Sequence, residues 1–477
     1  MYLVLVKQHI QLDTSHHIHG GRHAFACLAR ALAAAPGVAG TALVFAAPRA
    51  AVLHAAAAGS WLHQLRPLGG GGGGGGPEGA AWRRGRVEHR AVFRAADLAA
   101  AAEQAAAAGG ALPARLAALA AAGACALHLF VQNLHLLPFG PAGCARRAPA
   151  LLASWRRAAG VLCVSRFVEG YLRQHAAGWL PGGGGSEGGG GGPQTRVVSL
   201  AALGVFGPPP WPDCGAAAAQ RLWPDGGPGA PPGSPRQQQA GGWARRPVIG
   251  MLKVTPEKGA AVLAGLAARM PDCDFLAVHC TAPPAAAAAG GPGGHDPASG
   301  GGGGAADGIQ SILPLPPNVQ LVAPTADLDG LISEMDLVIM PSLLQEAFGM
   351  ALVDAALRGV PAVAASAGAL AEAGGGAAAE APVSLAACHA GGGARGTNAP
   401  AAAAAACGAH PSWALRRLPR EQPLDAWEAA ARRLLAGREA YAAASRAART
   451  AAMDLVGSPE GARAEVAALA GWLAGRG

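Results

Sequence analysis

The amino-acid sequence predicts an α/β protein with two domains, each built on a parallel sheet. Short apolar runs of strand length alternate with helix-length segments along the chain, which is typical of βα units. With 477 residues, the chain is long enough for two or three domains that each bury a core. A Pro/Gly/Gln-rich span separates two such series. We therefore expect domains at residues 1–206 and 245–477, joined by a linker at residues 207–244.

The first series opens with an apolar run, MYLVLV, that predicts a core strand. A loop with several His residues and Gly20-Gly21 follows, and then the amphipathic helical segment HAFACLARALAAAPG. Glycines at a strand-to-helix turn let backbone amides approach a ligand closely, so Gly20 and Gly21 are candidate binding residues. The His residues match no familiar zinc spacing, which favours a polar loop over a metal site.

Three later segments complete the first series. We expect a strand running into a loop at HLFVQNLHLLPFGP (residues 128–141) and a strand at VLCVS (residues 161–165), with Ser165 starting a helix. The segment RVVSLAALGVF (residues 196–206) predicts the last strand and the exit loop of the first domain.

The second series repeats the pattern from Arg245 onward. It contains a strand, a loop with Lys258-Gly259, and a helix, and Lys253 is a second candidate cation in this segment. The strands DFLAVHC and VQLVAP, the helix ADLDGLISEM and Ala/Arg-rich C-terminal helices follow. Asp272 and Asp274 spell D-x-D, a pattern that binds metal in some nucleotide-sugar enzymes. Because they lie at an expected helix-to-strand turn, a turn role is favoured.

Residues 337–373 form the most informative segment. The run LVIM predicts a buried strand that Pro341-Ser342 closes, and a helix begins at Gly349 and ends near residues 359–361. Glu346 lies in the loop and Asp354 in the helix, where Cβ atoms lean toward the N-terminus, so both carboxylates are expected to face one cleft.

The start of this helix is suited to an anion. Its first N–H groups have no helical partner and carry the positive end of the helix dipole, at Gly349, Met350 and Ala351. An anion cradle flanked by two acceptors of hydroxyl groups fits a sugar nucleotide, which has hydroxyls on the sugar, a central diphosphate and hydroxyls on the ribose.

These motifs resemble those of the GT-B glycosyltransferases, in particular the retaining family called glycosyltransferase family 4. In this chain the matching residues are Pro341-Ser342, Glu346, Phe348-Gly349, Asp354, Gly359-Val360-Pro361, Gly368-Ala369, Glu372 and Lys258-Gly259. The chain departs from the family pattern at four positions, with Asp354 for a second Glu, Ala369 for Gly, Met251 for Arg and Gln132 where a His is common.

The resemblance implies a GT-B fold, with two Rossmann-like domains facing each other across a cleft, and transfer of a hexosyl group from a nucleoside-diphosphate sugar with retention of configuration. It assigns catalytic roles to Glu346, Lys258 and His135. Glu346 holds the donor sugar, and the polar group near that sugar is His135 or Gln132, with His135 preferred. Asp354 is expected to bind the ribose of the donor, and Lys258 and Lys253 are expected to bind its diphosphate. The remaining donor-binding residues are Phe348, Gly349, Met350, Ala351, Gly20 and Gly21. No metal, cofactor or protein nucleophile is required.

Composition narrows the class of protein. The hydrophobic fraction is 51%, and 72 Gly and 38 Pro gather largely in runs that predict low-complexity Gly/Ala-rich loop insertions. The net charge is +8, but the Arg pairs are dispersed without interleaved aromatics, which disfavours nucleic-acid binding.

Nine singly spaced Cys and an N-terminus that looks like a strand favour a reducing, cytoplasmic setting, with organelle targeting left open. We expect no transmembrane segment; peripheral membrane contact stays open.

Two alternative functions remain at this point. A sugar-nucleotide-binding protein of the same fold that has lost turnover is compatible with the four departures from the family pattern. A phosphorylase-type enzyme would need a Lys-bound pyridoxal phosphate. The donor base and sugar, and an acceptor that is a sugar, a lipid or a small molecule, are not determined by these motifs.

Overall fold

The computed structural model describes residues 2–7, 20–36, 38, 40–46, 66–67, 79–84, 87–92, 127–134, 137, 139–142, 158–176, 194–224, 242–279, 315–325, 327–385 and 421–475. The chain divides into two compact units, the first comprising residues 1–132, 146–209 and 456–477 and the second residues 133–145 and 210–455. Compared with the expected domains, residues 456–477 group with the first unit and residues 133–145 and 210–244 with the second.

The first unit contains a five-stranded sheet with the strand order β1-β2-β5-β4-β3. Its strands β1, β2 and β5 are parallel, whereas β4 pairs antiparallel with both β5 and β3. Helix α1 follows β1 and packs on β2, as the sequence predicts for this strand–helix–strand segment. The bounds are β1 (Tyr2–Lys7), α1 (Gly20–Ala34), β2 (Gly40–Ala46), β3 (Arg66–Pro67), β4 (Gly79–Arg84) and β5 (Val87–Val92).

A second, three-stranded parallel sheet completes the first unit, with the order β6-β7-β8. Helix α6 follows β7, and the Ser165 hydroxyl accepts a hydrogen bond from the Val168 amide at 3.1 Å, so the predicted N-cap is confirmed. The C-terminal helix α16 contacts α1, and its Trp472 ring lies 4.9 Å from that of His128, which explains why this helix groups with the first unit. The bounds are β6 (Leu127–Val131), β7 (Ala158–Cys163), α6 (Arg166–His175), β8 (Gln194–Val197) and α16 (Pro459–Leu473).

The second unit is built on one six-stranded sheet with the order β11-β10-β9-β12-β13-β14, and every pair in it is parallel. This is the strand order of a doubly wound Rossmann fold. The strands are short and almost entirely apolar, as expected where both faces are covered. They are β9 (Val248–Val254), β10 (Asp274–His279), β11 (Val319–Val322), β12 (Leu337–Met340), β13 (Ala362–Ala365) and β14 (Ala379–Ala381).

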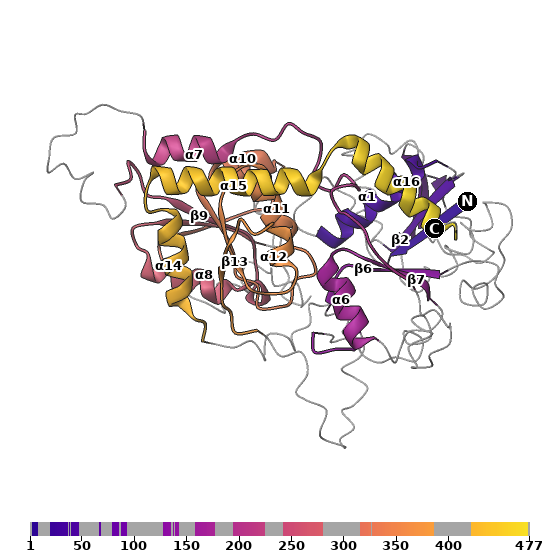
Figure 1. Cartoon of the computed structure of the whole chain (residues 1–477), viewed down its shortest axis with the longest axis horizontal. Helices are drawn as coiled ribbons and strands as arrows, with labels where there is room; N and C mark the ends of the chain where they lie inside the picture. Colours follow the sequence, from indigo (N-terminus) through magenta and orange to yellow (C-terminus); the bar gives the residue numbers. More distant parts are fainter. Residues whose placement is uncertain are drawn as a thin grey trace, which may run out of the picture. The chain divides into compact units, whose positions relative to one another are not determined.

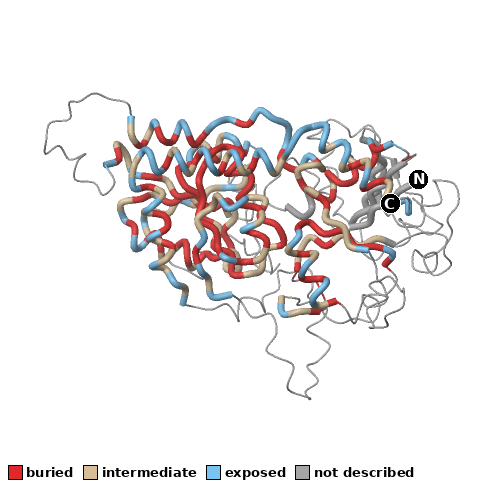
Figure 2. The backbone as a smooth tube through the Cα atoms, viewed as in Figure 1, coloured by how far each residue is buried: buried red, intermediate tan, exposed pale blue. Residues whose placement is uncertain are grey.

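Helices cover both faces of this sheet. Helices α7, α10 and α15 lie on one side and α8 and α14 on the other (Figure 1), with α7 against α10 and α14 against α8. The buried residues concentrate in the sheet between them (Figure 2), where Ile249 and Phe275 are at most 1% exposed. Each such side chain contributes about 1.5–3 kcal/mol of burial free energy. The helices are α7 (Cys214–Leu222), α8 (Ala260–Arg269), α10 (Leu328–Ser333), α11 (Met350–Leu357), α12 (Leu370–Ala373), α14 (Leu424–Leu434) and α15 (Arg438–Val456).

Helix α7 lies in the span that the sequence predicts to be only a linker, so that expectation is wrong for residues 214–222. Asp213 caps the helix by accepting a hydrogen bond from the Ala216 amide at 2.9 Å. The prediction failed because Pro and Gly on either side of the Ala-rich stretch dominate the local composition. Packing on α10 buries one side of α7, including Ala218 and Leu222.

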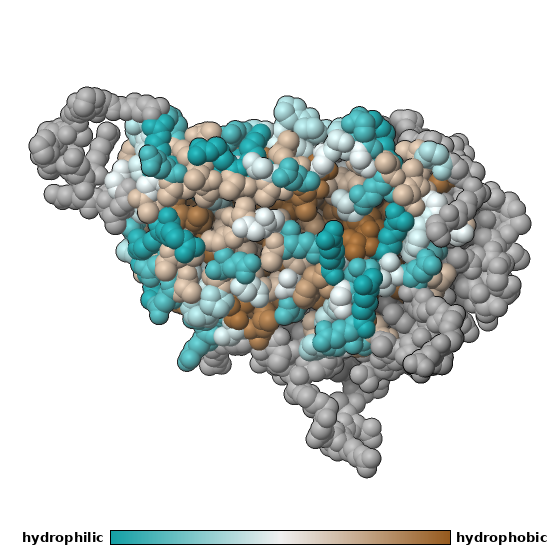
Figure 3. Space-filling view, in the orientation of Figure 1, coloured by the Kyte–Doolittle hydropathy of each residue, from teal (hydrophilic) through white to brown (hydrophobic). Residues whose placement is uncertain are grey.

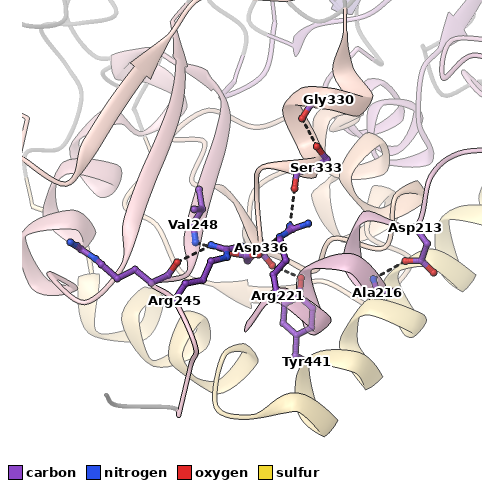
Figure 4. Close-up of polar contacts among 10 residues, drawn as sticks. Asp213, Ala216, Arg221, Arg245, Val248, Gly330, Ser333, Asp336 and Tyr441 are labelled. Atoms are coloured by element: carbon purple, nitrogen blue, oxygen red, sulfur yellow. Dashed lines mark hydrogen bonds and ion pairs between the residues drawn. The ribbon is translucent and has the colours of Figure 1, made fainter. Parts of the chain in front are cut away.

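A buried carboxylate fixes the amino end of β12 (Figure 4). Asp336 has no exposed surface, and it accepts hydrogen bonds from Arg245 at 2.6 Å and from the Val248 amide at 2.8 Å. The Tyr441 hydroxyl of α15 donates to the Asp336 carbonyl oxygen at 2.7 Å. Burial raises the pKa of Asp336, against the opposing effect of the Val248 amide and the two arginines Arg245 and Arg221. These contacts set the position of β12 beside β9.

The outward side of α15 carries hydrophilic side chains among alanines (Figure 3), which is the pattern of a solvated helix surface. Within the described ranges, no helix combines the length and the apolar character needed to cross a membrane.

Candidate active site at the switch point of the second sheet

The strand order of the second unit predicts where a ligand binds. From β9 the chain builds the sheet toward β10 and β11, and then crosses to β12 on the other side of β9. The connections leaving β9 and β12 therefore run in opposite directions, and the carboxyl ends of two strands at such a switch point are the usual ligand site of these sheets. The loops after β9 and after β12 carry Lys258 and Glu346, respectively.

The loop after β9 is held by a local cap. Thr255 begins a short 3-10 turn, Pro256–Lys258, and its hydroxyl accepts a hydrogen bond from the Lys258 amide at 3.3 Å. Gly259 follows with φ of 93°, and a Cβ there would lie 2.1 Å from the Pro341 carbonyl oxygen. Only glycine allows this approach, so the backbone that carries Lys258 packs directly against the start of the loop after β12.

The loop after β12 is held from two sides. The Leu343 amide donates to the Glu257 carbonyl oxygen at 3.0 Å, which ties it to the first loop. The Ala369 amide donates to the Glu346 carbonyl oxygen at 2.9 Å, and Glu346 forms a parallel β-bridge with Gly368. At Gly368, where φ is 67°, a Cβ would lie only 2.2 Å from the same carbonyl oxygen. The Gly-Ala segment after β13 thus fixes the main chain of Glu346.

Lys258 and Glu346, which are 88 positions apart in sequence, meet in an ion pair between Nζ and Oε1. Their side chains are 25% and 13% exposed, respectively, so both can reach solvent or a ligand. Burial by itself would raise the pKa of Glu346. The positive charge and hydrogen bond of Lys258, with smaller contributions from the Ser342 hydroxyl and from Lys253, outweigh that effect and hold the pKa below its usual value. Lys253, Lys258 and Glu346 therefore form one charged cluster.

The start of α11 borders this cluster. Phe348 and Gly349 are buried, whereas Met350 and Ala351 are half-buried. Gly349 precedes the first helical residue and makes no side-chain cap, so the first-turn amides keep their capacity to donate to an anion. The predicted anion cradle and the predicted charged residues thus belong to neighbouring loops at one edge of the sheet.

Asp354 lies further along α11 and has a partner within the protein. Its side chain is 5% exposed, and its Oδ1 lies 3.6 Å from Arg358 Nη1, one helical turn away. Arg358 also donates to the Asp354 carbonyl oxygen at 2.9 Å and pairs with Asp329 of α10. Asp354 is therefore less accessible than Glu346, and its assignment to the ribose stays a prediction.

Other predicted residues lie elsewhere. Gly20 and Gly21 are the first residues of α1 in the first unit. His135, the predicted neighbour of the transferred sugar, lies outside the described residues. Asp272 occupies the turn before β10 and pairs with Arg432 at 3.0 Å, so the predicted turn role is confirmed for this residue. Asp274 is the first residue of β10 and pairs with Arg246 at 3.1 Å.

Two residues that shape the site escaped the sequence interpretation. Thr255 caps the Lys258 turn, and the Thr-Pro pair at residues 255–256 is a recognisable signal for the start of a helical turn. Arg358 neutralises Asp354, and the spacing of four residues within one helix is the signal for that pair.

A comparison with protein families matches the segment of the chain that carries the loop after β12. The family model described as Glycosyl transferases group 1 matches residues 300–388, which include the loop after β12, α11 and β13. A search of curated protein sequences finds no match.

Several solved structures resemble the chain. Sucrose-phosphate synthase from Thermosynechococcus elongatus aligns over 100% of both chains with a TM-score of 0.54 and 15% identity. WaaG, a glycosyltransferase involved in lipopolysaccharide biosynthesis, aligns over 97% of this chain and 98% of its own with a TM-score of 0.46 and 12% identity. HepE of Anabaena in complex with UDP-glucose covers 80% of this chain and 85% of its own, with a TM-score of 0.42 and 16% identity.

The full-length alignment with sucrose-phosphate synthase shows that the chain has the GT-B fold, as the sequence predicts. The segment of the group 1 family lies in the second unit, around the predicted site. The comparisons therefore show a chain of GT-B fold whose second unit contains a segment similar to the group 1 glycosyl transferases.

Proposed function

We propose that the protein transfers a hexosyl group from a nucleoside-diphosphate sugar to an acceptor hydroxyl with retention of the anomeric configuration, as in glycosyltransferase family 4. The observation that carries the proposal is the cluster of Lys258, Lys253 and Glu346 at the switch point of the second sheet. This cluster offers cations for a diphosphate and one acceptor for sugar hydroxyls, with Lys253 at the carboxyl end of β9 and Lys258 and Glu346 on the loops after β9 and β12.

Each group has a defined task in this reaction. The bond between the anomeric carbon and the β-phosphate oxygen breaks, and negative charge develops on the departing diphosphate. Lys258, Lys253 and the amides of Gly349 to Ala351 stabilise that charge. Such electrostatic stabilisation is usually the largest single contribution to catalysis. Glu346 orients the donor sugar by accepting hydrogen bonds from its hydroxyls. The acceptor oxygen forms the new bond, and its proton goes to the departing phosphate.

Asp354 is proposed to accept a hydrogen bond from the ribose, a task it shares with its pairing to Arg358. Phe348 is proposed to line the donor site beside Gly349. No metal is assigned to the reaction, since the lysines and the start of α11 supply the positive charge. His135, Gly20 and Gly21 are retained as proposed contacts to the transferred sugar and the donor.

The test is a panel of UDP-, GDP- and ADP-sugars. One nucleotide class is expected to raise the melting temperature, because a ligand that binds only the folded state stabilises it by mass action. The same sugar nucleotide is expected to release free nucleoside diphosphate on incubation with acceptor mixtures. NMR of the product then reports the anomeric configuration, and inversion would contradict the family 4 assignment.

A second function is a sugar-nucleotide-binding protein without turnover. The observation behind it is the set of four departures from the family pattern, at Asp354, Met251, Ala369 and Gln132. Such a protein shows thermal stabilisation by a nucleotide sugar but no release of nucleoside diphosphate, so the same panel separates the two functions.

A further inference from the structure

The ion pair between Lys258 and Glu346 places two groups in direct contact that the proposed reaction needs separately. The Lys258 ammonium is required by the diphosphate, and the Glu346 carboxylate by the sugar hydroxyls. In the structure the carboxylate occupies one side of the ammonium and neutralises its charge. An incoming diphosphate therefore meets a negative charge at the place where it needs a positive one.

Geometry restricts how this conflict is resolved. The main chain of Glu346 is fixed by the Ala369 amide and by the close approach of Gly368. The main chain of Lys258 is fixed by the Thr255 cap and by the packing of Gly259 on Pro341. Because both loops are anchored, the two groups exchange partners by rotation of their long side chains, which are partly exposed, and not by movement of the loops.

We propose that Glu346 is an internal counter-ion that competes with the donor's diphosphate for Lys258. Donor binding displaces the carboxylate from the ammonium, and the displaced carboxylate then binds the sugar hydroxyls. After transfer the sugar has left, so Glu346 returns to Lys258 and promotes release of the nucleoside diphosphate. This inference rests on the proposed function and adds a role for Glu346 in product release.

The inference makes an unusual prediction for Glu346→Gln. The substitution removes the competing charge, so UDP, GDP or ADP, whichever the parent binds, is expected to bind about 3- to 10-fold more tightly while transfer becomes at least 10-fold slower. A side chain that only contacts the sugar would leave the affinity for the free nucleoside diphosphate unchanged. Inorganic pyrophosphate serves as a second probe, since it contains the diphosphate alone.

Three further variants complete the calorimetric measurement. Glu380→Gln changes the net charge equally at a position on β14, where Glu380 pairs with Ser366, and is expected to leave affinity unchanged. Introducing Glu346→Gln into a Lys258→Ala background is expected to give no gain in affinity, because the ammonium for which the carboxylate and the diphosphate compete is absent. Glu346→Asp keeps the charge but is one methylene shorter, and it is expected to give a smaller gain in affinity. It replaces the Gln variant as the test if that variant does not fold.

The outcomes separate this inference from the proposed function. If the parent binds a nucleoside diphosphate and neither Glu346 variant binds it more tightly, the counter-ion role is wrong and the proposed function stands. An equal gain in the Glu380→Gln or the double variant would also overturn it, since the effect would then be general charge. If neither the parent nor any variant binds a nucleotide or pyrophosphate, the proposed function fails and this inference fails with it.

Discussion

Replacing Gly368 by alanine tests whether the backbone behind Glu346 controls the site. The residue has φ of 67°, a conformation that costs a residue with a side chain about 1–2 kcal/mol. The new Cβ would lie 2.2 Å from the Glu346 carbonyl oxygen, so the loop has to retreat by about 1.3 Å to reach an ordinary van der Waals separation of about 3.5 Å. The hydrogen bond from the Ala369 amide to that oxygen, worth about 1 kcal/mol, is then weakened.

Two effects are expected from Gly368→Ala. The second unit loses about 2–3 kcal/mol of stability, which lowers its melting temperature by roughly 2–4 °C for each kcal/mol in a domain of this size. A displacement of about 1 Å is enough to slow a reaction by about 100-fold, so the larger shift at Glu346 is expected to slow sugar transfer by at least about that factor. The assays are thermal unfolding and release of nucleoside diphosphate from the donor identified by the nucleotide panel.

Gly376 provides a matched control. Its φ of 76° is similar, but a Cβ there meets nothing within 4 Å. Gly376→Ala is therefore expected to lose about 1–2 kcal/mol from backbone strain and to keep its activity. If the two variants have the same transfer rate, the contact of Gly368 with the Glu346 loop does not position the catalytic carboxylate, and the argument is refuted.

Three other predictions concern the charged cluster and its framework. Lys258→Ala is expected to lose about 3 kcal/mol of transition-state stabilisation and to bind the nucleoside diphosphate more weakly by calorimetry. Lys253→Ala is expected to show a smaller loss of both. An unchanged transfer rate and affinity in Lys258→Ala would contradict the electrostatic argument. The pKa of Glu346 is lowered in the folded state, so its ion pair stabilises the protein fully above the unfolded pKa of about 4.5 and less as the pH falls through the folded pKa. The difference in melting temperature between the parent and Glu346→Gln is therefore expected to be constant above about pH 5 and to shrink below it. Tyr441→Phe removes the hydrogen bond to the Asp336 carbonyl oxygen and is expected to cost about 1 kcal/mol in urea unfolding without changing nucleotide affinity.

Much of the second unit follows from the sequence because its signals are local. The run LVIM forms β12, and the glycine at residue 349 precedes α11 as predicted. Lys258 and Glu346 were predicted as donor-site residues from their motifs, and Lys253 as a substitute for a missing Arg; the structure pairs Lys258 with Glu346, and the charge of Lys253 acts on the same carboxylate. The interpretation failed at α7, where a short helix flanked by Pro and Gly depends on packing against α10 for its stability.

By itself, the sequence determined which residue types stand at the ends of β9 and β12, since turn, cap and strand preferences act between near neighbours in the chain. The tertiary structure decided which of these residues meet. The contact of Lys258 with Glu346 joins positions 88 apart, and it exists because β9 and β12 are adjacent and parallel in the sheet. The pairing of Arg358 with Asp329 of α10 depends in the same way on the tertiary structure, whereas the pairing of Asp354 with Arg358 joins residues four apart in the chain. Charge and motif specify the chemistry of a side chain, whereas its partner is fixed by the strand order and close packing that bring distant segments together.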